Sequence, residues 1–314
     1  TTQEVYLNGL STSLPEEIQA EILRTIPCLA KAEIMRPGYA IEYDYVPPVQ
    51  ITHSLETKLV EGLFLAGQIN GTSGYEEAAA QGLLAGINAA LKVKKKHAFI
   101  LDRSEAYIGV LIDDLVTKGT LEPYRMFTSR VEYRLVLRQD NADLRLMEKG
   151  YNLGLIPEAQ YRKLEYKREL IGAALKKLNT TFIKNPTKSG GAKTISAYQL
   201  IKSPGISLKN LSDKIDLGYQ IPEDVAQQVE ITIKYEGYIS KQQKQIDNFR
   251  SQENIKIPEG FKYDALRSLS REAIEKLNKI QPRSIGQALR ISGISLSDTT
   301  AILIHLHGRG KHGR

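Results

Sequence analysis

The sequence predicts an α/β layer over residues 1–97, followed by a mostly α-helical C-terminal domain. In the first 97 residues, short apolar runs of the strand type alternate with helical patterns. From Asp102 onward, strand signals become rare and the apolar positions recur at helical spacing. The lysines between Lys92 and Lys96 indicate a solvated boundary between the two parts.

The α/β part contains one clear helix and two candidate strands. Pro15 suits a first helical position, and Glu16 and Glu17 follow it in the first turn. The apolar positions of this helix fall on one face: Ile18, Ile22, Leu23 and Ile26. Residues 32–36 and 40–46 have the pattern of strands around a Pro37-Gly38 turn. We expect their sheet to extend into residues that this chain lacks.

The remaining chain is predicted to be helical, with a few connecting segments marked by glycine, proline or serine. The expected helices are 104–118, 129–139, 142–152, 158–179, 223–250, 264–280, 284–292 and 297–307. Ser129 and Glu132 form a capping-box pattern, and Pro157 and Pro222 suit the first turns of two long helices. Glycine, proline and serine within residues 184–205 predict a mobile connection. We therefore expect three domains: 1–97, 98–211 and 212–314.

The composition is that of an ordinary soluble protein. The chain has 314 residues, 41% hydrophobic content and 25% charged residues, enough for one large or two moderate cores. A net charge of +7 and a pI near 9.2 are a mild signal for a polyanionic partner. No apolar run approaches the roughly 18 residues of a membrane span, and no targeting pattern begins the sequence, so we expect a cytoplasmic location.

Cysteine and histidine usage argues against a metal site. The single cysteine, Cys28, excludes an internal disulfide and any cysteine-cluster metal site. It follows an apolar helix face with no neighbouring base, which favours a structural thiol over a nucleophile. The histidines lack helical ligand spacing apart from a tail cluster, which we interpret as a frayed basic end. We assign no metal ligand and no catalytic residue.

Residues 62–89 have the pattern of a buried strand, a glycine-rich turn and a close-packed helix. Leu63, Phe64 and Leu65 suit a strand that is covered on both faces. The glycines that follow, Gly67, Gly71 and Gly74, let the backbone turn and approach a ligand without a Cβ. A helix is expected to begin near Tyr75, and its free N–H groups suit a phosphate or the pyrimidine edge of a flavin.

A second group of candidate residues consists of arginines. Arg130, Arg134 and Arg138 recur every four residues, so on the expected helix they lie on one face with about 6 Å of rise per step, close to the spacing of phosphates. Two further arginines, Arg125 and Arg145, flank them, and the nearby rings of Tyr124, Phe127 and Tyr133 offer flat surfaces for an unstacked base. The alternative is an interior ion network with Glu132, Asp140 and Asp143.

Four ordered blocks of this sequence resemble the MnmG (GidA) family. They are RPGYAIEYD at 36–44, the glycine-rich stretch 62–89 with GQINGTSGYEE at 67–77, the block 122–145 that begins EPYRMFTSR, and SIGQA at 284–288. The resemblance covers nearly the whole chain. It implies that the α/β part is a partial FAD-binding, Rossmann-like layer. No G-x-G-x-x-G turn stands here between a strand and a helix, as in a dinucleotide-binding fold, so we expect the C-terminal half of a longer protein.

The resemblance also implies a function. The family's enzyme is the FAD-dependent subunit that adds an aminomethyl or carboxymethylaminomethyl group at carbon 5 of the wobble uridine of tRNA. Its co-substrates are NADH and methylenetetrahydrofolate, and it forms a homodimer that assembles with the GTPase MnmE. In the family, the region corresponding to residues 264–307 docks this GTPase. Two alternatives stay open: a non-catalytic tRNA-binding or assembly module, and a flavin oxidoreductase that does not act on RNA.

These arguments select two sets of candidate residues. The cofactor-binding set is Gly67, Gln68, Asn70, Gly71, Thr72, Gly74, Tyr75 and Glu76. The tRNA-binding set is Arg125, Arg130, Arg134, Arg138 and Arg145. For Gln68 and Asn70 the competing interpretation is a side chain that holds its own turn, and for Glu76 and Glu77 it is stabilisation of the helix dipole.

Overall fold

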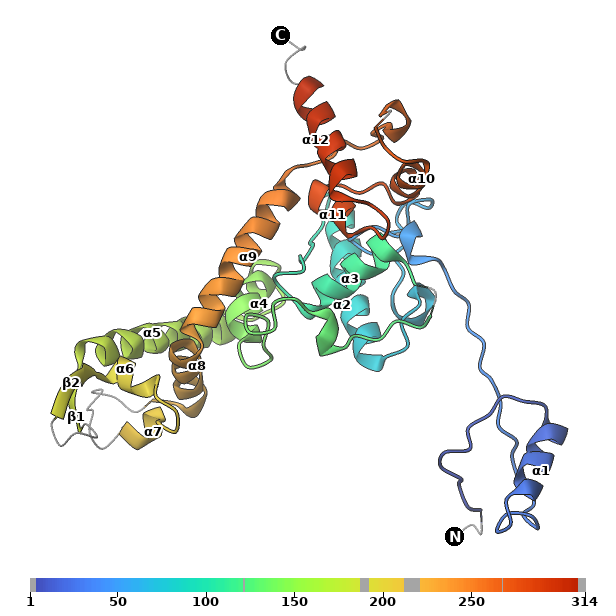
Figure 1. Ribbon diagram of the computed structural model, residues 1–314, viewed down its shortest axis with the longest axis horizontal. Coiled ribbons are helices and arrows are strands. Elements are labelled where there is room, and N and C mark those ends of the chain that lie inside the picture. Colours follow the sequence, from blue (N-terminus) through green and yellow to red (C-terminus); the bar gives the residue numbers. More distant parts are fainter. Residues whose placement is uncertain (1–3, 121, 187–191, 212–220, 267, 310–314) are drawn as a thin grey trace. The chain divides into compact units, whose positions relative to one another are not determined.

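The computed structural model describes residues 4–120, 122–186, 192–211, 221–266 and 268–309 (Figure 1). The chain forms two compact units, Thr1–Tyr45 and Val46–Arg314. Across the described residues, no helix is long and apolar enough to cross a membrane. The expected three-domain division stays a prediction.

The first unit contains the expected helix but no sheet. Helix α1 spans Glu16–Thr25, with Pro15 at its N-cap, and its buried residue is Gln19. The Gln19 side chain accepts a hydrogen bond from Gly38 N at 2.7 Å and donates one to Gly38 O at 2.8 Å, which pins the following loop. Residues 32–36 and 40–46 form no strand with any described residue of this unit. Because their sheet was expected to extend into residues that this chain lacks, the two strands stay a prediction.

The second unit begins with the elements that carry the glycine-rich turn. They are η1 (Pro48–Gln50), η2 (Gly67–Asn70), α2 (Tyr75–Val93), α3 (Tyr107–Lys118), η3 (Thr128–Arg130) and α4 (Ala142–Asn152). Ile51, Leu55, Leu111 and Leu115 form the core between these segments. The expected strand at residues 63–65 is wrong, since Phe64 makes only an isolated bridge with Glu56.

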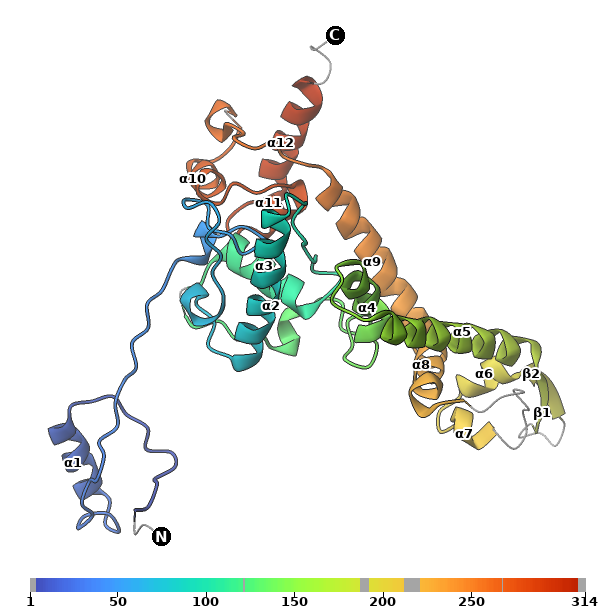
Figure 2. The ribbon, with the colours of Figure 1, turned by 180° about the vertical axis from the view of Figure 1, so that it is seen from behind.

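A second core is built by the long helix α5 and the segments that follow it. These are α5 (Glu158–Thr180), β1 (Phe182–Pro186), β2 (Ala192–Ser196), α6 (Ala197–Ile201), α7 (Leu208–Leu211) and α8 (Glu223–Lys234). The two strands pair antiparallel, with Ile183 opposite Ile195. Both apolar side chains pack on the core of α5 and α8, so the connection expected at residues 184–205 is structured in its described part. The two views show α6 and α8 beside α5 (Figure 1, Figure 2).

The last part of the chain is a bundle of short helices. Its elements are α9 (Glu236–Asn254), η4 (Tyr263–Ala265), α10 (Arg271–Ile280), α11 (Ile285–Arg290) and α12 (Leu296–Arg309). The Ser270 and Ser284 side chains cap α10 and α11. The single helix expected over 223–250 is broken at Tyr235, because α8 packs against α5 whereas α9 packs against α11.

A buried carboxylate on α3 holds the second unit together. Arg290 of α11 donates two hydrogen bonds to Asp113, from Nε at 2.7 Å and from Nη2 at 2.8 Å. Arg103 donates to the same carboxylate at 3.1 Å and to Asp114 at 2.7 Å. His53 Nε2 lies 3.2 Å from Asp113 Oδ1. We call these five residues the Asp113 network.

The network favours the ionised form of Asp113. Burial by itself would raise the pKa of this carboxyl, but the hydrogen bond with His53 and the ion pair with Arg290 outweigh burial and hold the pKa well below its ordinary value. Removing one member of such a buried group leaves an uncompensated charge, which is costly. The ionised Asp113 therefore balances the charges of the buried Arg103 and the half-buried Arg290.

We expect Asp113→Asn to lower the free energy of unfolding by about 3 kcal/mol, because Arg103 and Arg290 lose a shared counter-charge. Urea unfolding at neutral pH measures the loss. The matched control is Glu132→Gln, since Glu132 also pairs with Arg103 but its side chain is 46% exposed. The control is expected to cost about 1 kcal/mol or less.

The difference in stability between the wild type and Asp113→Asn should also depend on pH. A carboxylate whose folded pKa is depressed adds stability above its unfolded pKa and loses that contribution as the pH falls. The stability gap between wild type and Asp113→Asn should therefore shrink as the pH is lowered below about 4. A gap that stays constant down to pH 2 would contradict the assignment.

Candidate cofactor loop and nucleic-acid interface

The glycine-rich turn is held by a glutamine that the sequence reasoning did not select. Gln81 of α2 accepts hydrogen bonds from Gly67 N at 3.2 Å and from Asn70 Nδ2 at 2.9 Å. Its own amide donates to Thr72 Oγ1 at 2.9 Å. Gly67 and Gly71 have φ of +83° and +81°, a region that side chains disfavour. The turn is thus a preformed structure packed on α2.

The candidate cofactor residues divide into two groups. Asn70, Thr72 and Gly74 are buried, and the side chains of Asn70 and Thr72 hold the turn. Gln68, Tyr75 and Glu76 are exposed around the start of α2. The Gln68 side chain makes no hydrogen bond with any described residue, so it does not cap its own turn. A signal for Gln81 was available, because a polar side chain interrupts the apolar positions of the helix there.

The first turn of α2 is tied to the block at 122–130 by a buried carboxylate. Glu77 Oε1 accepts a hydrogen bond from Met126 N at 2.7 Å and lies 3.3 Å from Arg125 Nε. Burial alone would raise the pKa of Glu77, but the backbone donors and Arg125 lower it. Oε2 is buried without a partner among the described residues, and it fills the place where a Cβ on Gly74 would stand. Glu77 therefore does more than stabilise the helix dipole.

Tyr124 joins the glycine-rich turn to the block at 122–130, although the two are far apart in the sequence. Tyr124 N donates to Gly71 O at 2.7 Å, and Ser73 N donates to Tyr124 O at 3.2 Å. The buried Tyr124 hydroxyl donates to Asp114 Oδ2 at 2.9 Å. Because Asp114 also pairs with Arg103, the glycine-rich turn is connected to the Asp113 network.

The prediction of a helix at 129–139 is wrong. Arg130, Arg134 and Arg138 therefore do not line up along one helical face. Residues 128–130 form the short η3, and the following residues form turns. Val131, Tyr133 and Leu137 are all buried against Val110 and Ile246. Positions 131 and 133 are about 200° apart on a helix, so one helical face cannot bury both. Glu132 accepts from Arg103 instead of completing a capping box.

The five candidate arginines differ in how far they are exposed to solvent. Arg125, Arg130 and Arg134 are exposed, whereas Arg138 and Arg145 are half-buried. The guanidinium of Arg130 lies 4.2 Å from the centre of the Tyr124 ring, and its Nε donates to Arg125 O at 2.8 Å.

The two half-buried arginines, Arg138 and Arg145, are hydrogen-bonded to other groups of the protein. Arg138 donates to Asp140 at 3.1 Å and to Gln228 at 3.0 Å. Arg145 donates to Asn141 at 2.9 Å and to Arg138 O at 2.9 Å, and its burial beside Arg138 lowers its pKa. The ion-network alternative therefore holds for Arg138 with Asp140. Of the aromatic candidates, Tyr124 and Tyr133 are buried, and Phe127 is 58% exposed.

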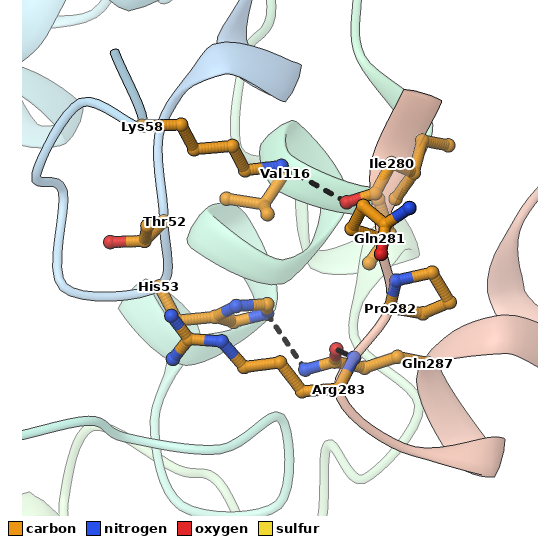
Figure 3. A pocket seen from close by; sticks show the side chains of 10 residues that line it. Thr52, His53, Lys58, Val116, Ile280, Gln281, Pro282, Arg283 and Gln287 are labelled. Atoms are coloured by element: carbon orange, nitrogen blue, oxygen red, sulfur yellow. Dashed lines mark hydrogen bonds between the residues drawn. The ribbon is translucent and has the colours of Figure 1, made fainter. Parts of the chain in front are cut away.

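Two hollows lie away from this junction. The first is a cavity of about 20 Å³ between residues 52–58 and 280–287, where Lys58 donates to Ile280 O at 3.0 Å (Figure 3). It has room for about one water molecule, which is too little for a cofactor. The second is an open groove of about 720 Å³, lined mainly by Leu266, Leu296, Ala301 and Ile304. Within the described part of the chain, no cluster of three acidic, histidine or cysteine side chains could hold a metal.

Three protein-family models match separate parts of the chain. "Glucose inhibited division protein A" matches residues 1–97. "tRNA modifying enzyme MnmG/GidA C-terminal helical domain" matches residues 158–243, and the corresponding "C-terminal helical bundle" matches 245–314. The first of these two covers α5 to α8 and the start of α9, and the second covers the rest of α9 and the helices α10 to α12.

Curated relatives and solved structures agree with these models. The chain is 54% identical to the tRNA uridine 5-carboxymethylaminomethyl modification enzyme MnmG of Listeria monocytogenes, and 52% identical to that of Geobacillus kaustophilus. Each match covers 97% of this chain and 50% of the relative, so the chain spans about half the length of these proteins.

The structure of Aquifex aeolicus GidA in its form II crystal superposes with a TM-score of 0.83 at 46% identity, over 97% of this chain and 50% of that one. Which half of such a protein the chain represents stays a prediction, because the covered shares give lengths and not positions. Sequence models, relatives and fold agree over nearly all of the chain: it belongs to the MnmG (GidA) family.

Proposed function

We propose that this chain is part of an FAD-dependent enzyme that modifies the wobble uridine of tRNA. The product carries an aminomethyl or carboxymethylaminomethyl group at carbon 5, and NADH and methylenetetrahydrofolate are the co-substrates. The observation that carries the proposal is the junction of the glycine-rich turn with residues 122–130 through Tyr124 and Glu77. It joins a loop suited to a cofactor to a segment with exposed arginines. The names of the relatives support the choice of tRNA.

The residues around the turn fit the role of a partial flavin site. Gly74, the N-cap of α2, offers no side-chain cap. The Glu77 carboxylate bonds its own backbone N–H, so the first-turn N–H groups left for a ligand are those of Tyr75 and Glu76. Gln68 adds an exposed amide at the start of the turn. Gly67 lies so close to α2 that a Cβ added to Gly67 would stand 3.2 Å from the Cβ of Ala78. When bound, the flavin supplies the redox chemistry, while these residues bind and orient it.

The exposed arginines and one aromatic ring suit the RNA. Arg125, Arg130 and Arg134 can contact phosphates, because their guanidinium groups are exposed. Phe127 is 58% exposed and offers an aromatic ring on which an unpaired base can stack. Arg138 and Arg145 are left out of this proposal, since both are used internally.

The open groove at Leu266, Leu296 and Ile304 is the proposed docking surface for an MnmE-type GTPase. Leu296 is 72% exposed and Ile304 is 68% exposed, a degree of apolar exposure typical of a partner surface. We propose that the full-length protein is a cytoplasmic homodimer that binds this GTPase. The second candidate function is a non-catalytic tRNA-binding module, and absorbance of the full-length protein at flavin wavelengths separates the two.

In the full-length protein, Gln68→Ala should weaken FAD binding by about fivefold, because a hydrogen bond worth about 1 kcal/mol is lost. Flavin titration followed by absorbance measures the change. Gln50→Ala is the matched control, and it should leave FAD affinity unaltered because Gln50 lies in η1, outside the turn. Unchanged affinity in Gln68→Ala would remove Gln68 from the site.

Reversing Arg125, Arg130 and Arg134 to Glu should weaken tRNA binding and lower the slope of log affinity against log salt by roughly 2 to 3. Filter binding at several salt concentrations measures both quantities. The control replaces three exposed lysines of the C-terminal bundle, Lys256, Lys262 and Lys279, with Glu. Equal losses in the two variants would show a general charge effect and would remove the arginines from the interface.

The double substitution Leu296→Asp and Ile304→Asp should abolish co-purification with the GTPase, since it places two charges in an apolar contact. Flavin content and the thermal unfolding midpoint should not change, because both side chains are exposed. Leu59→Asp with Leu83→Asp, two exposed leucines elsewhere, is the control. A double variant that still captures the GTPase would place the docking surface elsewhere.

A further inference from the structure

The aromatic ring of Tyr124 is covered by an arginine side chain. Tyr124 is only 4% exposed, so its ring does not offer an RNA base the flat surface that the sequence suggested. The guanidinium of Arg130 lies over the ring, with its central carbon 4.2 Å from the ring centre. A cation in this position is attracted by the electron-rich face of the ring. The flat group that remains exposed here is therefore the guanidinium of Arg130, which is planar.

The ring beneath Arg130 is fixed at both of its ends. The Tyr124 hydroxyl donates a hydrogen bond to Asp114 Oδ2 at 2.9 Å. Burial raises the pKa of this hydroxyl and Asp114 raises it further, so the hydroxyl keeps its proton and stays a donor. At the other end, Tyr124 N donates to Gly71 O at 2.7 Å, and Tyr124 O accepts from Ser73 N at 3.2 Å. The ring is thus a rigid support.

Arg130 itself is oriented but not neutralised. Its Nε donates a hydrogen bond to Arg125 O at 2.8 Å. No carboxylate in the described part of the chain forms an ion pair with Arg130, whereas Arg125 lies 3.3 Å from Glu77 and Arg138 pairs with Asp140. The charge of Arg130 and the side of its guanidinium that faces away from Tyr124 are therefore open to a ligand. Because the ring and the Arg125 carbonyl already hold the side chain, binding costs less conformational entropy.

A held, planar cation offers more than a phosphate needs. A phosphate is bound by charge and hydrogen-bond donors, which a flexible lysine also supplies. An unstacked RNA base needs a flat surface, and in RNA-binding proteins the guanidinium plane of arginine serves as one. An enzyme that acts on a base has to hold that base outside its stack. The hydrogen bonds of Tyr124 with Gly71 and Ser73 place this flat surface beside the glycine-rich turn.

We propose that Arg130 is the platform on which the target uridine of the RNA stacks. The side of the guanidinium that faces away from Tyr124 contacts the base, and its remaining N–H groups donate to a neighbouring phosphate. Tyr124 is a positioning residue, since it acts by supporting Arg130. The inference rests on the proposed function, which supplies the RNA and the uridine. Arg134, for which no described aromatic ring provides such a support, contacts a phosphate only.

The test is a double-mutant cycle between Arg130→Lys in the full-length protein and a tRNA whose wobble nucleotide lacks its base. Lysine keeps the charge and removes the plane. For the wild type, loss of the base should weaken binding about tenfold, because one stacking contact is lost. For Arg130→Lys, the same loss should cost about twofold or less. The slope of log affinity against log salt should stay at the wild-type value, because the charge is retained.

Arg134→Lys is the matched control, since Arg134 is exposed in the same segment and its Nε is likewise bonded to a backbone oxygen, Val131 O. This variant should keep the tenfold effect of the missing base. The comparison of the two tRNAs is made within each protein, so a small change in stability cancels. A tenfold effect that persists in Arg130→Lys, or no effect in the wild type, would overturn the platform and leave the proposed function standing. A wild type that binds tRNA no better than duplex DNA of equal length would overturn both.

The ring of the flavin is the competing occupant of the platform, and titration of each protein with FAD detects it. We expect Arg130→Lys to bind FAD with wild-type affinity. If FAD binding fell in this variant while the effect of the missing base stayed tenfold, the platform would hold the cofactor, and its assignment to the uridine would be wrong.

Discussion

The second unit depends on one buried charge, the carboxylate of Asp113. Two guanidinium groups from distant parts of the sequence, Arg103 and Arg290, converge on it, and each is hydrogen-bonded to a further carboxylate. Buried arginines are tolerated only when their charge is balanced and their donors are satisfied. The position of α11 against α3 is therefore set by electrostatics in addition to apolar packing. The bundle of short helices is fixed to the first part of the unit in this way.

The candidate site is an extension of the same network. Asp114, beside Asp113, accepts the hydroxyl of Tyr124, and the backbone of Tyr124 pairs with the glycine-rich turn. A carboxylate on α2, Glu77, fixes the next residues from the other side. The turn and the arginine-bearing segment are thus joined by direct hydrogen bonds, an arrangement that the proposed function uses to bring a cofactor close to a base. The exposed arginines of the candidate interface, Arg125, Arg130 and Arg134, lie in an irregular segment whose backbone is held by tertiary hydrogen bonds.

The sequence by itself determined the elements whose signals are local. Helices α1, α2, α4 and α5 follow from apolar spacing and from Pro15, Pro157 and the glycine-rich turn, and family membership follows from four ordered motifs. Only the tertiary structure decided residues 129–139, where burial of Val131, Tyr133 and Leu137 overrides the four-residue repeat of arginines. It also decided which arginines stay exposed and that Gln81 holds the turn. The physical reason is that pairing and burial depend on residues distant in sequence, which local periodicity does not contain.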